Sequence, residues 1–278
     1  MRKRVLSIML FAAASGTVTA MADNAPLWLR DAAISPDGSR IAFTFKGDIY
    51  TVPTTGGKAS RLTALPSLEW APVWSPDGTK IAFATDRNGG SDIYIMGADG
   101  GHATRLTFDS ASETPEAFTP DGAEIVFSAA IQDAPSSVMF PTARLTEVYT
   151  VPAAGGRTRQ LLSTPAENIS YLPDGKSFLY HDVKGMENKF RKHHTSSVTR
   201  DIWLYDATTG RHTNLTNRYG EDRNPVVAEG GKAVYFLSER NGGSFNVYRM
   251  SLDNPADVKA VTDFKEHPVR FLSMADNG

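Results

Sequence analysis

The chain has 278 residues, of which 41% are hydrophobic and 22% are charged, and its formal net charge is −2. This length allows one large all-β domain or two ordinary domains, and the near-neutral charge argues against a nucleic-acid-binding protein. The chain has no cysteine, which excludes disulfides, a thiol nucleophile and thiolate metal sites.

The first 22 residues predict an export signal. Residues 1–4 (MRKR) are cationic, and Val5–Ala14 is an apolar run too short to span a membrane. Small residues follow, and both 18–20 (VTA) and 20–22 (AMA) fit a cleavage site. The sequence therefore predicts a signal peptide over residues 1–22, a periplasmic location, and no membrane span after cleavage.

A turn motif then recurs along the chain. The stretch WSPDGTKIAF covers residues 74–83, and close variants cover 34–43, 118–127 and 171–180. Proline presets φ for the turn, aspartate can bond the backbone ahead of it, and glycine accepts positive φ. Large and small apolar side chains alternate after each turn, as they do in a strand. Each copy therefore predicts half of a tight hairpin.

A second motif follows each turn, with an alternating strand, a Gly- or Asn-rich turn, and a closing strand that ends near Leu-Thr. Its copies cover residues 47–63, 91–107, 146–162, 200–216 and 245–262. One hairpin and one copy of this motif together give four short antiparallel strands. The sequence therefore predicts a repeating four-stranded unit.

The spacing of the turns predicts the architecture. They begin at Ser35, Ser75, Thr119 and Leu172, which are 40, 44 and 53 residues apart, and a weaker turn begins 57 residues later at Glu229. Four strands repeating about every 40–45 residues are typical of a β-propeller blade. The fold class is therefore predicted to be all-β, a propeller of four-stranded antiparallel blades over residues 26–278.

Two details complete this prediction. The longer spacings come from insertions between the second and third strands of their blades, near Ile131–Leu145 and Asp182–Thr199, which places both on one face of the ring. Residues His267–Gly278 resemble a first strand that runs into another turn. We therefore expect five complete blades plus the start of a sixth, and a propeller that is incomplete at the C-terminus.

Recurring side chains have structural interpretations. The large apolar residues that precede each turn are expected in the core between blades: Ile34, Trp74, Phe118 and Tyr171. The aspartates Asp48, Asp92 and Asp201 recur once per blade, so they are expected to satisfy backbone donors rather than to bind a metal. No Gly-x-Ser-x-Gly, His-Glu-x-x-His, P-loop or dinucleotide motif occurs. The sequence predicts no catalytic residue, metal or cofactor in this chain.

One segment is strongly basic. Residues 184–200 contain five cations, namely Lys184, Lys189, Arg191, Lys192 and Arg200. Two interpretations remain open: a solvated loop, or a loop over the ring that binds an anionic group such as the C-terminal carboxylate of a peptide. In the second interpretation Arg191 and Lys192 are the candidate substrate-binding residues, and Arg144 in the other insertion could assist from the same face.

The repeat resembles known propellers. The pattern SPDGTKIAF…DRNGGSDIYIMGADGG…RLT (residues 75–107) is similar to the repeat of TolB, the prolyl-oligopeptidase group and tricorn-type peptidases. The insertions, MFPTARLTEVYTVPAAGGR (139–157) and KFRKHHTSSVTRDIWLYD (189–206), resemble the N-terminal propeller of bacterial tricorn protease homologues. This resemblance covers Pro26–Gly278.

The resemblance implies a function for a longer protein. In tricorn homologues a six-bladed propeller precedes a seven-bladed one, a PDZ domain and the catalytic serine peptidase domains. The expected role is to gate or guide peptides to those downstream domains. Peptides, the downstream domains and further copies of the same protein are the expected partners. Two alternatives stay open: a non-enzymatic TolB-like periplasmic binding propeller, and the propeller of a prolyl-oligopeptidase-type enzyme.

Overall fold

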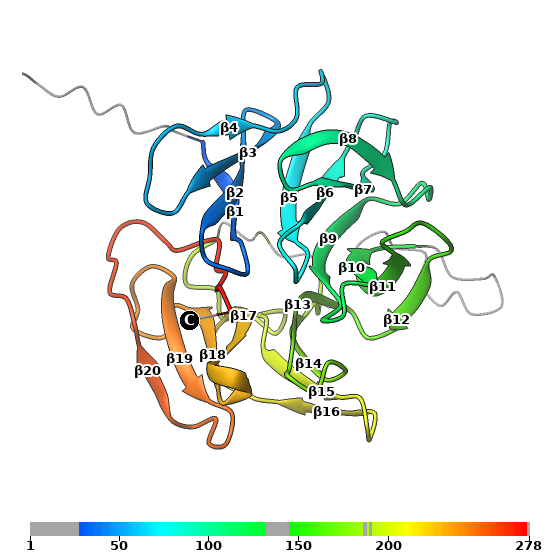
Figure 1. The fold of residues 1–278 in the computed structure, drawn as a ribbon. Helices are drawn as coiled ribbons and strands as arrows, with labels where there is room; N and C mark the ends of the chain where they lie inside the picture. Colours follow the sequence, from blue (N-terminus) through cyan, green and yellow to red (C-terminus); the bar gives the residue numbers. More distant parts are fainter. Residues whose placement is uncertain (1–27, 132–144, 186–187, 189–190, 277–278) are drawn as a thin grey trace, which may run out of the picture.

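The computed structural model describes residues 28–131, 145–185, 188 and 191–276. The predicted signal peptide, Arg144 and Lys189 therefore lie outside the described residues. Within these ranges the chain forms five four-stranded sheets arranged around a common centre (Figure 1). Each sheet is an antiparallel meander whose strands follow chain order, which confirms the predicted propeller with five four-stranded blades.

The strands have the following bounds. Blade 1 contains β1 (Arg30–Ile34), β2 (Arg40–Phe45), β3 (Asp48–Pro53) and β4 (Ser60–Arg61). Blade 2 contains β5 (Glu69–Trp74), β6 (Lys80–Thr85), β7 (Asp92–Gly97) and β8 (Gly100–Arg105). Blade 3 contains β9 (Glu113–Phe118), β10 (Glu124–Ala129), β11 (Glu147–Pro152) and β12 (Arg159–Leu162).

The remaining two blades are built in the same way. Blade 4 contains β13 (Ala166–Tyr171), β14 (Phe178–Asp182), β15 (Ile202–Asp206) and β16 (Arg211–Asn214). Blade 5 contains β17 (Asp222–Ala228), β18 (Ala233–Ser238), β19 (Asn246–Ser251) and β20 (Val258–Ala260), with a short 3-10 turn, η1 (Glu229–Gly231), between β17 and β18. Both insertions lie between the second and third strands of their blades, as predicted.

The Pro-Asp-Gly segments form the predicted hairpin turns. In blade 1, Ile34 pairs with Ile41 across the turn, and Asp37 accepts the backbone N–H of Ser39 at 3.0 Å. In the fifth turn a Cβ on Gly231, whose φ is +86°, would lie 2.7 Å from Cδ of Pro173 in blade 4. Only glycine fits this approach between neighbouring turns.

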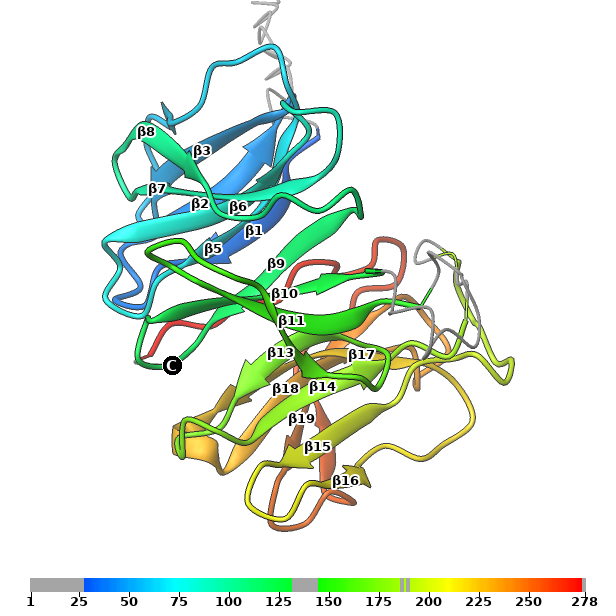
Figure 2. The same ribbon diagram turned by 90° about the vertical axis from the view of Figure 1, so that its right-hand side faces the viewer.

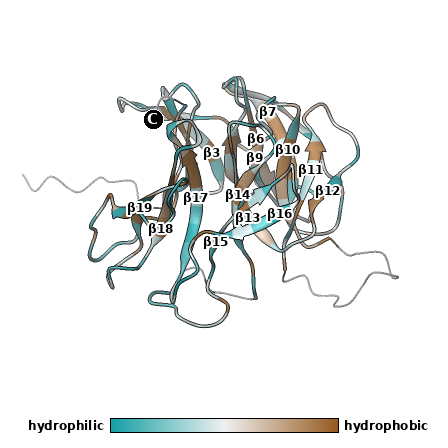
Figure 3. Ribbon diagram, turned by 90° about the horizontal axis from the view of Figure 1, so that it is seen from below, coloured by the Kyte–Doolittle hydropathy of each residue, from teal (hydrophilic) through white to brown (hydrophobic). Residues whose placement is uncertain are grey.

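The core lies between successive blades, and hydrophobic residues follow strands such as β6, β10 and β11 (Figure 3). Trp74 and Phe118 are 8% and 6% exposed and lie in inter-blade clusters, as predicted. Tyr171 packs against the cluster between blades 3 and 4. Ile34 differs, because it is only partly buried and lines the central channel. Blade 1 has no preceding blade in the described chain to cover it.

The Leu-Thr ending of the closing strands has a physical cause. In blade 2, Oγ1 of Thr107 accepts the N–H of Ile93 at 2.8 Å, just where strand β7 begins. Three more threonines cap the same position of their blades: Thr63, Thr216 and Thr262. The threonine thus satisfies a backbone donor that the sheet leaves unpaired.

This cap corrects the expectation for the recurring aspartates. Instead of accepting backbone donors, they form ion pairs with cations of the same blade: Asp48 with Arg61 at 2.6 Å, Asp92 with Arg105 at 2.8 Å, and Asp201 with Lys184 at 2.7 Å. The threonine occupies the role that was assigned to the aspartate, so the carboxylate is left to face a side-chain cation.

No strand is assigned after β20 in the residues described up to 276, so a sixth blade is not seen as a sheet. Residues 269–276 instead run back to the centre, next to blades 5 and 1 (Figure 1). Val269 and Leu272 pack against Leu237, Phe245 and Val247 of blade 5. Among the described residues, no helix has the length and apolar character needed to cross a bilayer.

Candidate functional site

A channel runs through the centre of the ring. Its cavity of about 490 Å³ is lined by the innermost strand of every blade and by the segment after β20. One wall is largely apolar and includes Val73, Trp74 and Phe118. The wall formed by blades 4 and 5 carries amides and hydroxyls instead, from Asn168, Ser170 and Asn224. Glu116 of blade 3 and Asp276 also line the cavity, so polar groups occur on several sides of an otherwise apolar lining.

The two ends of the channel differ chemically. The Pro-Asp-Gly turns lie at one end, called here the turn face, and the described part of the blade-4 insertion (residues 183–185 and 191–199) lies at the other, called here the insertion face (Figure 2). On the turn face, the hydroxyl of Ser35 and the N–H and hydroxyl of Ser39 lower the pKa of Asp37 to about 2. Ser75 and Thr79 do the same for Asp77. Both exposed carboxylates are therefore anionic at neutral pH.

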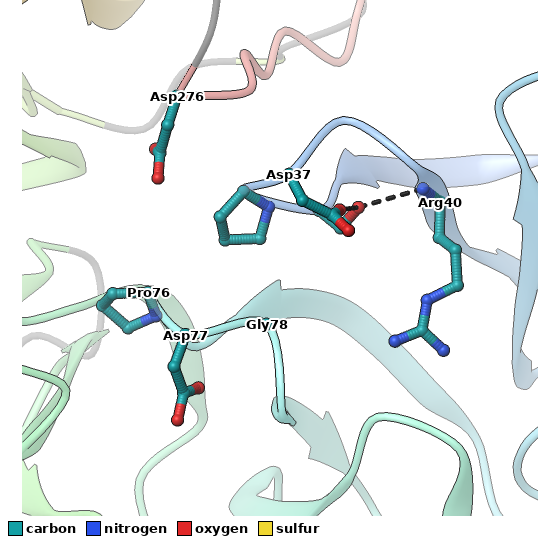
Figure 4. Close-up of a pocket in the computed structure, with 8 residues that line it drawn as sticks. Asp37, Arg40, Pro76, Asp77, Gly78 and Asp276 are labelled. Atoms are coloured by element: carbon teal, nitrogen blue, oxygen red, sulfur yellow. Dashed lines mark hydrogen bonds between the residues drawn. The ribbon is translucent and has the colours of Figure 1, made fainter.

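A shallow pocket of about 330 Å³ opens between the first two turns (Figure 4). Asp37, Asp77 and Asp276 surround it, and the N–H of Asp276 donates to the carbonyl of Pro36 at 2.8 Å. Arg40 also borders the pocket, but its guanidinium is paired with Asp99 at 2.7 Å. The turn face is thus predominantly acidic around this pocket.

The basic insertion leans over blade 5 on the insertion face. Nζ of Lys192 donates to Oγ of Ser244 at 3.1 Å and to the carbonyl of Glu266 at 2.9 Å. The backbone N–H of His193 donates to Oε2 of Glu239 at 2.5 Å. These contacts attach the insertion of blade 4 to blade 5, so Lys192 holds the loop in place.

The other cations of this segment differ in their surroundings. Lys184 pairs with Asp182 and Asp201, and these partners raise its pKa although burial opposes the charge. Arg200, which is 8% exposed, pairs with Glu221 at 3.1 Å. Arg191 is exposed. Of the predicted binding residues, Arg191 and Lys192 are therefore both exposed, and the described side-chain hydrogen bonds to blade 5 come from Lys192.

A buried polar network beside the channel was not predicted. His181 is 2% exposed; its Nδ1 accepts the N–H of Asn224 at 3.2 Å and its Nε2 lies 3.4 Å from Glu167. Burial lowers the pKa of His181, so the ring is neutral and donates from Nε2. Burial opposes ionisation of Glu167, yet hydrogen bonds from His181 and Thr146 lower its pKa to about 2.

The network is built on bulges in the innermost strands. The pairing of β13 shifts register between Glu167 and Ser170, and that of β17 shifts between Arg223 and Val226. The bulged residues Asn168 and Asn224 have φ of 59° and 54°. Asparagine is among the few side chains that tolerate this region, so the asparagines ahead of the turns of blades 4 and 5 were the available sequence signal.

Metal binding has no support among residues 28–131, 145–185 and 191–276. Within these ranges no group of three or more His, Asp or Glu side chains is placed to hold an ion. The six histidines are distributed over several blades, and the buried ones, His181 and His194, contact carboxylates and hydroxyls. The central channel, the acidic pocket on the turn face and the basic insertion over blade 5 are the candidate functional features.

A series of antiparallel four-stranded blades arranged around a central channel defines a β-propeller protein. The chain belongs to the family of tricorn protease N-terminal beta propeller domains, which matches residues 26–278. The crystal structure of the tricorn protease superposes with a TM-score of 0.73 at 22% identity, covering 88% of this chain and 23% of that one.

Two further proteins are similar. The structure of a putative TolB from Agrobacterium tumefaciens gives a TM-score of 0.69 at 17% identity and covers 88% of this chain and 84% of that one. Tricorn protease homolog 1 of Streptomyces coelicolor is 40% identical over 65 residues, which are 23% of this chain and 6% of that protein. The chain aligns with 35% or less of the length of the curated relatives.

Proposed function

We propose that this chain is the N-terminal propeller of an exported tricorn-like serine peptidase, in which it guides peptides to a catalytic domain of the same polypeptide. The family match over residues 26–278 carries this proposal. Relatives named as peptidases agree with it, among them Dipeptidyl-peptidase 5 of Porphyromonas endodontalis, which is 36% identical over 89 residues. The signal-like residues 1–22 support export to the periplasm.

The charges at the two ends of the channel suit such a role. Carboxylates surround the pocket on the turn face, and cations are concentrated in the insertion of blade 4. A free peptide carries a carboxylate at its C-terminus, which the cations attract and the carboxylates repel. Peptides, downstream domains and further copies of the same protein are therefore the proposed partners, with Arg191 and Lys192 proposed as carboxylate-binding residues and Arg144 as a third.

A TolB-like binding propeller is the second candidate. The putative TolB structure matches most of both chains, at 88% and 84% coverage, whereas the match to tricorn covers a part of a longer protein. A prolyl-oligopeptidase-type propeller is a third candidate, with a TM-score of 0.54 to a prolyl endopeptidase. Peptide turnover by the full-length protein separates the first and third candidates from the second.

The proposed binding of the peptide carboxylate is tested in the full-length protein. Arg191→Ala is expected to raise KM roughly five- to tenfold for peptides with a free C-terminus, because one charge-assisted hydrogen bond is lost. Arg191→Ala with Lys192→Ala should raise it further, because this double substitution removes the second cation and also the bonds that attach the loop to blade 5. Peptides with an amidated C-terminus serve as the control and should change less than about twofold. Equal changes for both substrates would mean that the loop has only a structural role.

We also propose that residues 268–276 form the innermost strand of a sixth blade. Oγ of Ser273 accepts the N–H of Ile34 at 3.1 Å, just as Oγ of Ser170 accepts the N–H of Val227 at 2.9 Å. Ile34 and Val227 hold the same place in their blades, because each pairs with the start of the next strand. Ser273 thus relates to blade 1 as Ser170 of blade 4 relates to blade 5.

A longer chain tests this assignment. A version extended by three further strands is expected to melt at a higher temperature than residues 23–278, because the added strands would cover Phe45 and Tyr50, which are only partly buried. Thermal unfolding by circular dichroism is the measurement. An extension of equal length with a scrambled sequence is the control, and equal melting temperatures would refute the sixth blade.

A further inference from the structure

Two asparagines stand side by side on the polar wall of the channel. Asn168 of β13 and Asn224 of β17 both line the cavity of about 490 Å³, and their strands are neighbours at the centre of the ring (Figure 1). Each occupies the bulge of its strand with a left-handed backbone. The same left-handed bulge occurs at Asp31 and Ala71 of blades 1 and 2, so the backbone belongs to the repeat and the amide side chains distinguish blades 4 and 5.

One hydrogen bond fixes the two amides relative to each other. Nδ2 of Asn224 donates to Oδ1 of Asn168 at 2.5 Å. In the part of the chain that the structure describes, no hydrogen bond uses Nδ2 of Asn168 or Oδ1 of Asn224. The pair therefore presents one donor and one acceptor to the cavity.

The backbone behind this pair is held by neighbouring side chains. Oε2 of Glu116 in blade 3 accepts the N–H of Asn168 at 2.9 Å. Nδ1 of His181 accepts the N–H of Asn224 at 3.2 Å, and Glu167 orients the imidazole from its other side. The bulge donors are thus satisfied from within the protein, which leaves the asparagine side chains available to a ligand.

The free donor and acceptor of the asparagine pair indicate which kind of ligand would bind. In an extended peptide the N–H and the C=O of one residue point to the same side, as they do toward a neighbouring strand. A donor and an acceptor placed next to each other match these two groups. Val73, Trp74 and Phe118 of blades 2 and 3 give the cavity an apolar surface, beside Glu116, that can receive uncharged side chains.

We propose that Asn168 and Asn224 form a binding site for the main chain of an extended, uncharged peptide segment inside the channel. This inference rests on the proposed function in that its ligand is a peptide. The site forms hydrogen bonds to the N–H and C=O of a single residue, so it accepts many side chains. It is separate from the cations of the insertion face, which are proposed to bind the terminal carboxylate.

Glycine substitutions provide the test, because glycine keeps the left-handed backbone and removes only the amide. The probe is acetyl-trialanine N-methylamide, titrated into the isotope-labelled chain and followed by NMR. Asn168→Gly and Asn224→Gly are each expected to weaken binding roughly tenfold, the effect of one hydrogen bond. Ala71→Gly is the matched control, since Ala71 occupies the same bulge in blade 2 at φ 51°, and should change binding less than about twofold.

An ester analogue of the probe, which lacks one N–H, should bind wild type more weakly than the amide probe does. Wild type and Asn224→Gly should bind this ester with equal affinity. Equal binding of the amide probe to wild type and both asparagine variants overturns the inference and leaves the proposed function standing. The same holds if only trialanine with a free carboxylate binds. If neither peptide binds, the proposed function fails as well. A neutral oligosaccharide that binds as tightly as the peptide overturns the choice of ligand.

Discussion

Replacing Arg87 with alanine is expected to lower the free energy of unfolding by about 3 kcal/mol, because it leaves a buried carboxylate without its counter-charge. Glu69, at the start of β5, has a fully buried side chain and pairs with Arg87 at 3.1 Å. The guanidinium also stacks on Tyr94 at 4.4 Å from the ring centre. Removing it takes away both the charge and the packing, which chemical denaturation with circular dichroism would measure.

Blade 5 supplies a matched comparison. Arg240 occupies the place of Arg87 and pairs with the buried Asp222 at 3.0 Å, but Asp222 also pairs with Arg218 at 3.0 Å. Arg240→Ala therefore leaves one cation in place and should cost only about 1–2 kcal/mol. Adding Glu69→Gln to Arg87→Ala should recover part of the first loss. Equal losses in the two blades, or no recovery, would contradict the charge argument.

The repeat made the fold predictable. A turn such as Pro36–Gly38 specifies a tight hairpin, and its recurrence at intervals close to 40 residues fixes four strands per blade. Side chains such as Trp74 and Phe118 could be assigned to the core because blades 2 and 3 have a neighbour on both faces. These features are local or periodic, so a single sequence contains them.

Contacts between distant segments could not be predicted in this way. Lys192 belongs to a basic stretch in the sequence, but its role depends on Ser244 and on the carbonyl of Glu266, which is 74 residues away. The pairing of Asn168 with Asn224 joins bulges of two blades across 56 residues. A bulge shifts a side chain from one face of a strand to the other, and no alternation pattern predicts where it occurs.

Glu113 shows how one blade departs from the others. It begins β9 as Glu69 begins β5, and it is fully buried. Oε2 accepts a hydrogen bond from Thr107, while Oε1 has no hydrogen-bond partner. In the described part of the chain no cation pairs with Glu113. Burial, with a contribution from the nearby Asp92, raises its pKa to about 7.

Glu113→Gln is therefore expected to stabilise the protein in a pH-dependent way. The pKa is about 7 in the folded state against the usual value of 4.5, so between these values the folded chain binds more protons than the unfolded chain. Stability then falls as pH rises through that window, by up to about 3 kcal/mol. Glutamine carries no charge at any pH and escapes this loss.

The variant should match the stability of wild type near pH 4.5 and exceed it by up to about 3 kcal/mol near pH 8 in urea unfolding. Asp253→Asn, at an exposed position in blade 5, is the control and should change stability by less than about 0.5 kcal/mol. A constant difference between Glu113→Gln and wild type across this range would show that Glu113 does not titrate there.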